Sequence, residues 1–403
     1  METKVNTRTS DLAALDSGLE KCRKSLVFCL GNQRKRCLHR SKRVAVIGIK
    51  GMPSRASGVE VHAENLYQRM SSRYEITAFC RKRYCAKICS NYKGIRIKYI
   101  PSINTKSLDA ISYTFVATIA ALLKGYDIYH FHALGPSSMC WLPKLFRKKV
   151  ICTVHGLDWK REKWGRLGRA YLQFGEKMLA KYADSVIVLT KADKEHFQKK
   201  WGITPTIISN GVNIPKKMED IMPRKGLEDG YILFLARLVP EKGIHYLIEA
   251  YIASSCTKKL VIAGDGSHSD DYVERLHHMA ERNRNIIFTG RVEGEELISL
   301  YQHASLYVLP SDLEGQPVGL LEAMSYGCLC LVSDIDANIE TLGDYGYYFK
   351  KGDVKSLTDK LKEFQAGKLT VDKEKEKSYI EEKYGWDAIT EKTIIEYGRL
   401  ENI

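Results

Sequence analysis

Short apolar runs recur along this 403-residue chain and alternate with amphipathic stretches of helical length. The earlier runs include Val44–Gly48, Val150–Val154 and Ser185–Leu189, and the later ones include Tyr231–Leu235 and Leu260–Ala263. Apolar runs of about four to eight residues that alternate with helical patterns are typical of parallel strands covered by helices on both faces. The pattern therefore predicts an α/β protein.

The alternation stops once, in the polar stretch from Lys216 to Gly230, and then resumes. A chain of this length exceeds one ordinary hydrophobic core, so we expect two Rossmann-like domains with a binding cleft between them. The expected segments are a basic flexible extension at residues 1–41, a first domain at 42–208, a linker at 209–229, a second domain at 230–380 and a closing helix at 381–403. The apolar stretch Ile111–Leu123 is too short to span a membrane and predicts a buried core helix.

The distribution of basic residues adds an expectation about the protein surface. The net charge is +15, and residues 1–43 hold eleven basic against four acidic residues. Basic clusters also occur at Lys144–Lys149 and Lys160–Arg166, the second beside Trp159 and Trp164. Such surfaces attract an anionic membrane or nucleic acid, and tryptophan suits the headgroup layer. No nucleic-acid module is recognisable, so we expect a peripheral protein at the inner membrane face; a solvated basic surface is the simpler alternative.

The eleven cysteines are odd in number and scattered along the chain, without a metal-ligand spacing. This usage favours reduced thiols in a cytoplasmic protein over a disulfide framework or a zinc site.

Two carboxylates, Glu314 and Glu322, flank a predicted strand-to-helix junction. Ligands of open α/β sheets bind where a strand ends and the next helix starts, and the free N–H groups of Val318, Gly319 and Leu320 would attract an anion there. A phosphate between carboxylates makes sense if the carboxylates hold sugar hydroxyls, so the segment favours a nucleotide-sugar site. Two surface glutamates that flank a turn are the plain alternative.

The Glu-x7-Glu spacing resembles the donor motif of retaining glycosyltransferase family 4, which has the GT-B fold. A second segment, Leu235–Gly243, closely resembles the GRLVPEKG block of that family, with Ala236 in place of the glycine. The resemblance implies that Arg237 and Lys242 hold the donor diphosphate. Physical chemistry agrees, because a lysine at a helix N-terminus opposes the helix dipole by about 0.3–1 kcal/mol unless an anion compensates.

The resemblance also implies roles for the carboxylates. Glu314 would hold hydroxyls of the donor sugar, and Glu322 the ribose of the nucleoside. Two glycine turns follow strands of the second domain, one at Gly264-Asp-Gly266 and one at Thr289-Gly-Arg291. In the family such loops lie near the nucleoside, so Gly266 and Arg291 are further donor-binding candidates.

In the first domain the loop Gly48–Gly58 joins a strand to a helix without a GxGxxG pattern. It resembles the glycine-rich loop of family 4 enzymes, in a subgroup of bacterial polysaccharide glycosyltransferases that includes rhamnosyltransferases, and it makes Gly58 a donor-side candidate. By the same resemblance, His155 matches the active-site histidine near the donor sugar, and Asp158, in the same block, is expected on the acceptor side. A buried structural histidine is the alternative.

His130 and His132 alternate on one predicted strand and therefore share a face. We expect His132 to line the acceptor side, because a metal site would need further ligands. The pair Asp334 and Asp336 mimics a DxD metal motif, but it follows the wrong strand for that role. The expected enzyme therefore uses no metal and no cofactor.

The resemblance covers the chain from about Arg43 to Tyr397, and it implies a closing helix that crosses back to the first domain. It implies a retaining transfer of a hexose or deoxyhexose from a nucleoside-diphospho sugar to a saccharide acceptor, which the basic first domain suggests is lipid-linked. An epimerase of the same shape, or a sugar-nucleotide binding protein without catalysis, remains open. Nucleic-acid binding is a weaker third alternative.

Overall fold

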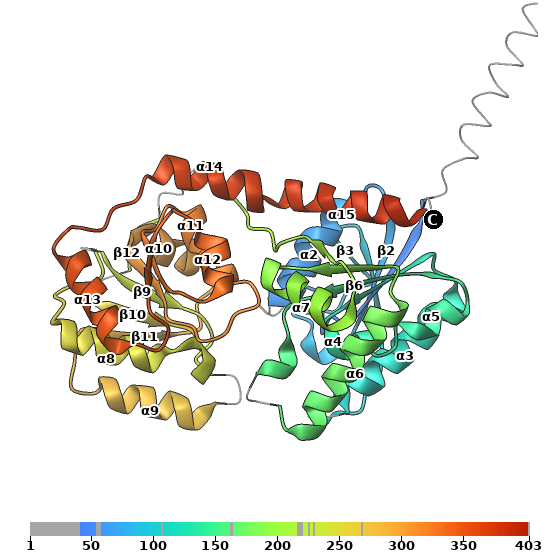
Figure 1. The fold of residues 1–403 in the computed structure, drawn as a ribbon, viewed down its shortest axis with the longest axis horizontal. Coiled ribbons are helices and arrows are strands. Elements are labelled where there is room, and N and C mark those ends of the chain that lie inside the picture. The colour runs from blue at the N-terminus through green and yellow to red at the C-terminus, as the bar shows by residue number, and fades with distance from the viewer. Residues whose placement is uncertain are drawn as a thin grey trace, which may run out of the picture. The chain divides into compact units, whose positions relative to one another are not determined.

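The computed structural model describes residues 41–53, 58–105, 108–161, 164–215, 221–224, 226–228, 230–266 and 269–401 (Figure 1). Nearly all of them belong to one compact unit that starts at Arg43. The predicted basic extension lies outside the described residues except at its last position, and so do residues 54–57 of the glycine-rich loop and 216–220 of the linker.

The first sheet has eight strands in the order β3-β4-β2-β1-β5-β6-β7-β8. The pair β3–β4 is antiparallel and all other pairs are parallel. Strands β1, β5 and β6 lie at its centre, and their apolar side chains are buried on both faces. The strands are β1 (Arg43–Ile47), β2 (Glu75–Cys80), β3 (Asn91–Tyr92), β4 (Ile95–Tyr99), β5 (Ile128–His132), β6 (Lys149–Val154), β7 (Ser185–Val188) and β8 (Thr206–Ile207).

Helices follow most of these strands, as the alternation in the sequence predicts. They are α2 (Gly58–Met70), η1 (Lys82–Tyr84), α3 (Asp109–Lys124), α4 (Leu134–Ser137), α5 (Trp141–Leu145), η2 (Asp158–Lys160), α6 (Arg166–Tyr182) and α7 (Lys191–Trp201). We call these elements the first domain.

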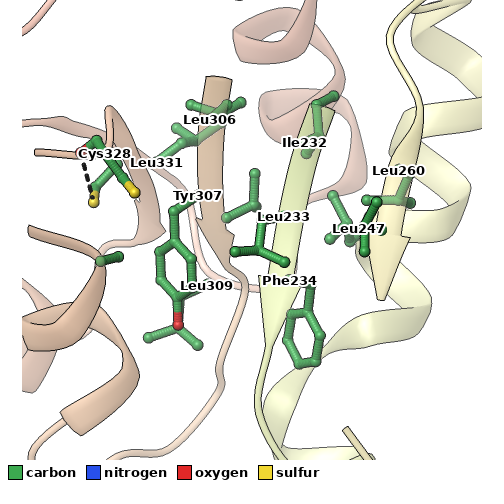
Figure 2. Packing of buried hydrophobic residues seen from close by; sticks show 14 of the residues in the cluster. Ile232, Leu233, Phe234, Leu247, Leu260, Leu306, Tyr307, Leu309, Cys328 and Leu331 are labelled. Atoms are coloured by element: carbon green, nitrogen blue, oxygen red, sulfur yellow. Dashed lines mark hydrogen bonds between the residues drawn. The ribbon is translucent and has the colours of Figure 1, made fainter. Parts of the chain in front are cut away.

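The second sheet is parallel throughout, in the order β11-β10-β9-β12-β13-β14. Figure 2 shows the core around its central strands, where Leu233, Phe234 and Tyr307 lie close together. The strand order reverses between β9 and β12, and ligands of open α/β sheets bind outside the carboxyl ends of the strands at such a reversal. The strands are β9 (Tyr231–Leu235), β10 (Leu260–Ala263), β11 (Ile286–Gly290), β12 (Ala304–Leu309), β13 (Cys330–Ser333) and β14 (Tyr347–Phe349).

The helices of this second domain are η3 (Pro240–Lys242), α8 (Ile244–Ser254), α9 (Asp270–Ala280), α10 (Gly294–His303), α11 (Val318–Ser325), α12 (Asp336–Leu342) and α13 (Val354–Gln365). Two final helices, α14 (Lys373–Tyr384) and α15 (Trp386–Glu401), close the chain. Helix α14 packs on α11 of the second domain, whereas α15 packs on α2 of the first. The chain therefore returns to the domain in which it started.

The expectation of two α/β domains with parallel sheets is confirmed. The expectation of a buried helix at 111–123 is correct for one face only, because α3 buries Tyr113 and Ala117 but leaves Phe115 and Leu123 51% and 82% exposed. Among the described residues, no helix is long and apolar enough to cross a membrane.

Candidate active site

Two loops of the second domain meet through an ion pair. Lys242 Nζ lies 2.5 Å from Glu314 Oε1, and Ser311 Oγ donates to the same oxygen at 2.7 Å. The two charged side chains are only 14% and 8% exposed, so their attraction is weakly screened. A residue with Cβ at Gly243, where φ is +67°, would place that atom 2.0 Å from the carbonyl oxygen of Pro310. Glycine thus lets the loop after β9 lie against the loop after β12.

Arg237 lies beside this pair. Protein atoms crowd its guanidinium although the residue keeps exposed surface, and this loss of solvation, together with the charge of Arg161, lowers the pKa of Arg237. The carboxylates of Glu314 and Asp158 act in the opposite direction. Asp158 is also paired with Arg161, at 3.1 Å. Arginines from both domains therefore face one position, which favours an anion with more than one charge.

Glu322 lies on α11, in a different environment from Glu314. Burial raises the pKa of Glu322, and Tyr301 donates a hydrogen bond to its Oε2 at 2.8 Å. At Gly319, a Cβ would lie 2.8 Å from the hydroxyl of Tyr307, so glycine allows α11 to approach the sheet. The N–H of Leu320 donates to a backbone carbonyl at 3.1 Å, so the expectation of a free N–H group at this residue is wrong.

The other donor-side candidates make contacts of their own. Gly266 forms a bridge with Leu238, and Arg291 forms an exposed ion pair with Glu293. Gly58 is the first residue of α2, and a Cβ there would meet nothing within 4 Å. No close backbone approach among the described residues therefore requires glycine at position 58.

The first domain contributes a cluster of histidines instead of charges. His130 and His132 share one face of β5 as predicted, and their rings stack with centroids 4.4 Å apart. His132 Nδ1 lies 3.0 Å from His155 Nε2, at the end of β6. Burial lowers the pKa of His130 to about 3 and holds the pKa values of His132 and His155 well below the ordinary range. All three rings are therefore neutral at neutral pH.

Sequence reasoning missed three residues of this cluster. Tyr67 of α2 lies 2.7 Å from His130 Nδ1 and 2.6 Å from His132 Nε2 through its hydroxyl oxygen. Tyr397 of α15 reaches His130 Nδ1 at 2.7 Å, from 267 residues further along the chain. His62, also on α2, has its ring centroid 5.0 Å from that of His155. The available signal was a histidine and a tyrosine on the buried face of an amphipathic helix.

The histidine cluster and the ion pair come together at two glycines. A Cβ on Gly315 would lie 2.6 Å from the carbonyl oxygen of His155, and a Cβ on Gly156 would lie 3.1 Å from the Cα of Gly315. The backbone after β6 therefore touches the backbone that carries Glu314. The structure thus brings His155, Glu314, Lys242, Arg237 and Asp158 into one region.

Trp159 follows Asp158 but does not extend outwards as an interfacial tryptophan would. Its indole N–H donates to Glu176 at 2.6 Å, and Trp201, His196 and Lys200 contact the same carboxylate. These contacts lower the pKa of Glu176 against the effect of burial, which acts first and in the opposite direction. The indole N–H of Trp159 is therefore engaged within the protein and anchors η2, whereas the membrane role expected for this stretch stays a prediction.

The two discounted aspartates stay apart from this region. Asp334 accepts a hydrogen bond from the N–H of Lys351 at 2.8 Å, and Asp336 begins α12. Neither belongs to a group of potential metal ligands within the described residues.

Comparison with known proteins agrees with this architecture. The chain matches the family model of glycosyltransferase family 4 over residues 56–215 and that of the glycosyl transferases group 1 over residues 218–386. Among solved structures it is similar to HepE of Anabaena in complex with UDP and glucose, with a TM-score of 0.72 at 16% identity over 89% of this chain and 100% of that one. Two parallel-sheet domains with a returning helix are the GT-B fold, and the chain belongs to the family 4-like glycosyltransferases.

The sequence relatives match this chain over only part of its length. The chain is 33% identical over 178 residues to an uncharacterised glycosyltransferase of Methanocaldococcus jannaschii, which is 42% of this chain and 45% of that protein. It is 29% identical over 236 residues to the UDP-Gal:alpha-D-GlcNAc-diphosphoundecaprenol alpha-1,3-galactosyltransferase of Escherichia coli, which is 53% of this chain and 59% of that one. The matched region thus spans about half the length of these two relatives.

Proposed function

We propose that this protein transfers a hexose or deoxyhexose from a nucleoside-diphospho sugar to a saccharide, with retention at the transferred carbon. The observation that carries the proposal is the Lys242–Glu314 pair beside Arg237, because it brings two cations and a carboxylate that could hold sugar hydroxyls to one position. The similar Anabaena structure holds UDP and glucose, and the Escherichia coli relative is named for a UDP-Gal donor, which supports this donor class.

Electrostatics would supply most of the catalysis. As the sugar leaves, charge develops on the diphosphate, and fixed cations stabilise it without reorganisation. Lys242 is already held in place by Glu314 before the donor binds, and Arg237 keeps exposed surface that a donor could contact. The exposed side of Arg161 adds a third positive charge from the first domain. These cations do the work that a divalent ion does elsewhere, so the proposed transfer needs no metal.

The placement of the carboxylates bears on how a retaining transfer would proceed. Glu314 is engaged by Lys242 and Ser311, and Glu322 is buried under Tyr301, so neither is arranged as a nucleophile. We therefore propose attack on the face from which the diphosphate leaves, with the leaving phosphate taking the acceptor proton. His155, neutral and beside the Glu314 loop, would contact the donor sugar.

The first test is donor binding and metal dependence. A panel of nucleotide sugars is screened by thermal shift; a donor at about 100 times its dissociation constant should add about 2.7 kcal/mol of stability. With the donor identified, transfer to a saccharide acceptor should persist in excess EDTA. Activity that is lost in EDTA and restored by Mg²⁺ or Mn²⁺ would contradict the proposal, and conversion of the donor without any acceptor would favour an epimerase.

The acceptor is proposed to be lipid-linked, with the first domain at an anionic membrane face. Helix α5 packs against both α3 and α6, and these three helices and the residue that follows α5 expose large apolar side chains: Leu123, Leu145, Phe146 and Leu167. Arg166 and Arg169 of α6 lie beside Leu167 and are basic, as a membrane-binding helix requires. Lys144 contributes less than expected, because it is paired with an aspartate, Asp184, at 2.6 Å.

Vesicle pelleting tests this surface. Binding should need anionic lipid, weaken at high salt and fall when Leu167 is replaced by Glu. Leu369→Glu in the second domain is no control, because Leu369 is buried and its replacement would change stability. A matched control is Ile252→Glu, an exposed apolar residue of the second domain (47% exposed). Equal pelleting with neutral vesicles, or an unchanged Leu167→Glu variant, would contradict membrane attachment through this surface.

A further inference from the structure

Three histidines from three elements converge in the first domain. His62 lies on α2, His132 on β5 and His155 directly after β6, and one ring nitrogen of each lies within 4.8 Å of the other two. This is the single group of three or more potential metal ligands among the described residues. From the sequence alone, only His130 and His132 were expected on one face, and a metal ion needs more ligands than that strand provides. In the fold, His62 from α2 and His155 after β6 join His132.

The environment of His62 points to a ligand. The residue is 4% exposed, and its Nδ1 has no hydrogen-bond partner among the described residues. The side chain of Asn210 is the neighbouring polar group that acts on this ring, and its Oδ1 likewise has no partner among the described residues. A buried polar atom without a hydrogen-bond partner destabilises the folded state. A metal ion at this position would remove that destabilisation.

The surrounding contacts fit a metal centre as well. The second ring nitrogen of His132, Nε2, lies 2.6 Å from the hydroxyl of Tyr67. Histidine ligands usually donate their other ring N–H to such an oxygen, which fixes the ring and the tautomer. Tyr67 is itself fixed through His130, at 2.7 Å. The short contact between His132 Nδ1 and His155 Nε2, at 3.0 Å, is also near the spacing of two nitrogens around one small ion.

We propose that His62, His132 and His155 form a binding site for a transition-metal dication of the zinc type, with a fourth position open to water or another ligand. Neutral imidazoles bind Zn²⁺, Cu²⁺ and Ni²⁺ well and Mg²⁺ poorly. Binding involves no redox step. The proton shared by His132 Nδ1 and His155 Nε2 moves to the other nitrogen of the ring that carries it, so that both facing nitrogens can bind the ion and each ring keeps one proton; the Nε2–H of His132 then donates a hydrogen bond to the hydroxyl of Tyr67. No net proton release is needed.

This site goes beyond the proposed transfer and acts against it. An ion held by His155 takes that residue away from the donor sugar, so occupancy would inhibit a reaction that itself needs no metal. Added Zn²⁺ should therefore reduce transfer, and EDTA should restore it. Metal binding is measured by spectroscopy, so its result does not depend on the transferase activity.

The experiment uses Co²⁺ as a probe on the full chain. Wild-type protein should develop the visible absorption of four-coordinate Co²⁺, saturating at one ion per chain. His62→Gln should lose it, or bind at least about tenfold more weakly. The matched control is His278→Gln, whose side chain is 78% exposed in the second domain. Absence of the absorption in wild type, or its full retention in His62→Gln, would overturn the proposal.

A second measurement needs no variant and covers the case in which His62→Gln does not fold. Pulsed electron paramagnetic resonance of wild-type protein loaded with one Cu²⁺ per chain counts the coordinated imidazoles. Three coupled imidazole rings are the expected result. Fewer than three would overturn the proposed ligand set.

Discussion

The two domains build their polar sites by different means. In the second domain, Lys242 and Glu314 are opposite charges from loops that follow β9 and β12, two strands that pair directly. In the first domain, Tyr67, His130 and His132 are neutral groups that hold one another through hydrogen bonds. The first arrangement leaves charge available to a ligand, whereas the second removes it by burial. Whether a polar residue stays charged in this fold thus depends on its burial and on an oppositely charged partner.

The largest expected effect comes from removing one charge of the Lys242–Glu314 pair in the second domain. Lys242→Met should lower kcat by about 10²–10³-fold, because a fixed cation at the leaving group is lost and Glu314 stays without its partner. Glu314→Gln should have a similar effect. Steady-state kinetics with a confirmed donor measures both.

The control is Lys355→Met, which removes an exposed lysine paired with Asp359 on the same domain. If Lys242→Met keeps near-wild-type turnover, the assignment of the site is wrong. A Lys355→Met variant that loses activity equally would point to a general loss of structure.

The next effect tests whether the second domain also contains a neutral acid. Burial raises the pKa of Glu376 on α14 to about 8, and neither carboxylate oxygen has a hydrogen-bond partner among the described residues. It faces Cys328 and Cys330, with Lys373 as the nearest cation. Because the unfolded chain releases this proton near pH 4.5 and the folded one near 8, stability should fall as the pH rises between these values.

Glu376→Gln should therefore flatten this pH dependence and stabilise the protein at high pH. The gain should be about 1–3 kcal/mol, since the amide leaves its own polar atoms without partners. Thermal unfolding across the pH range measures it, with Glu374→Gln, an exposed neighbour on the same helix, as the control. An unchanged pH profile for Glu376→Gln would mean that Glu376 is already ionised in the folded protein.

A smaller effect is expected from the neutral, hydrogen-bonded cluster of the first domain. Tyr397→Phe removes the hydroxyl that links α15 to His130, and Tyr67 still satisfies the same nitrogen. We expect a loss of about 1 kcal/mol in urea unfolding. Tyr347→Phe in the second domain, whose hydroxyl contacts Thr370 near the surface, should cost less. Equal losses would show that burial of the hydroxyl contributes nothing.

The smallest effect concerns the surface around the same helix. Arg73 and Glu391 form an ion pair at 2.9 Å between exposed side chains of the α2–β2 turn and α15. A double-mutant cycle should give a coupling of about 0.2–1 kcal/mol that disappears in high salt. A larger, salt-independent coupling would mean that surface charge, and not the buried Tyr397, attaches α15 to the first domain.

The same contrast explains what the sequence could predict. Lys242 and Glu314 stand in short motifs, so local pattern and resemblance identified them before their contact was known. Strand positions were also predictable, because parallel strands are continuous apolar runs, as in Tyr231–Leu235. His62 and Tyr397 were not predictable, because their polar atoms acquire a role only when α2 and α15 pack together. The outward apolar face of α3 was missed because hydrophobicity alone does not reveal which side of a helix is covered.

Gly156 and Gly315, finally, limit which amino acids the chain tolerates. Peptide units from the two domains touch there with no side chain between them. Alanine at Gly315 would meet the His155 carbonyl oxygen, and Gly156 also has a φ of +111°, which side chains rarely adopt. A saturation library screened for folding should therefore accept glycine alone at both positions. The contact between these two glycines therefore fixes the spacing between the backbone that carries His155 and the backbone that carries Glu314. A change of side-chain rotamer cannot alter that spacing.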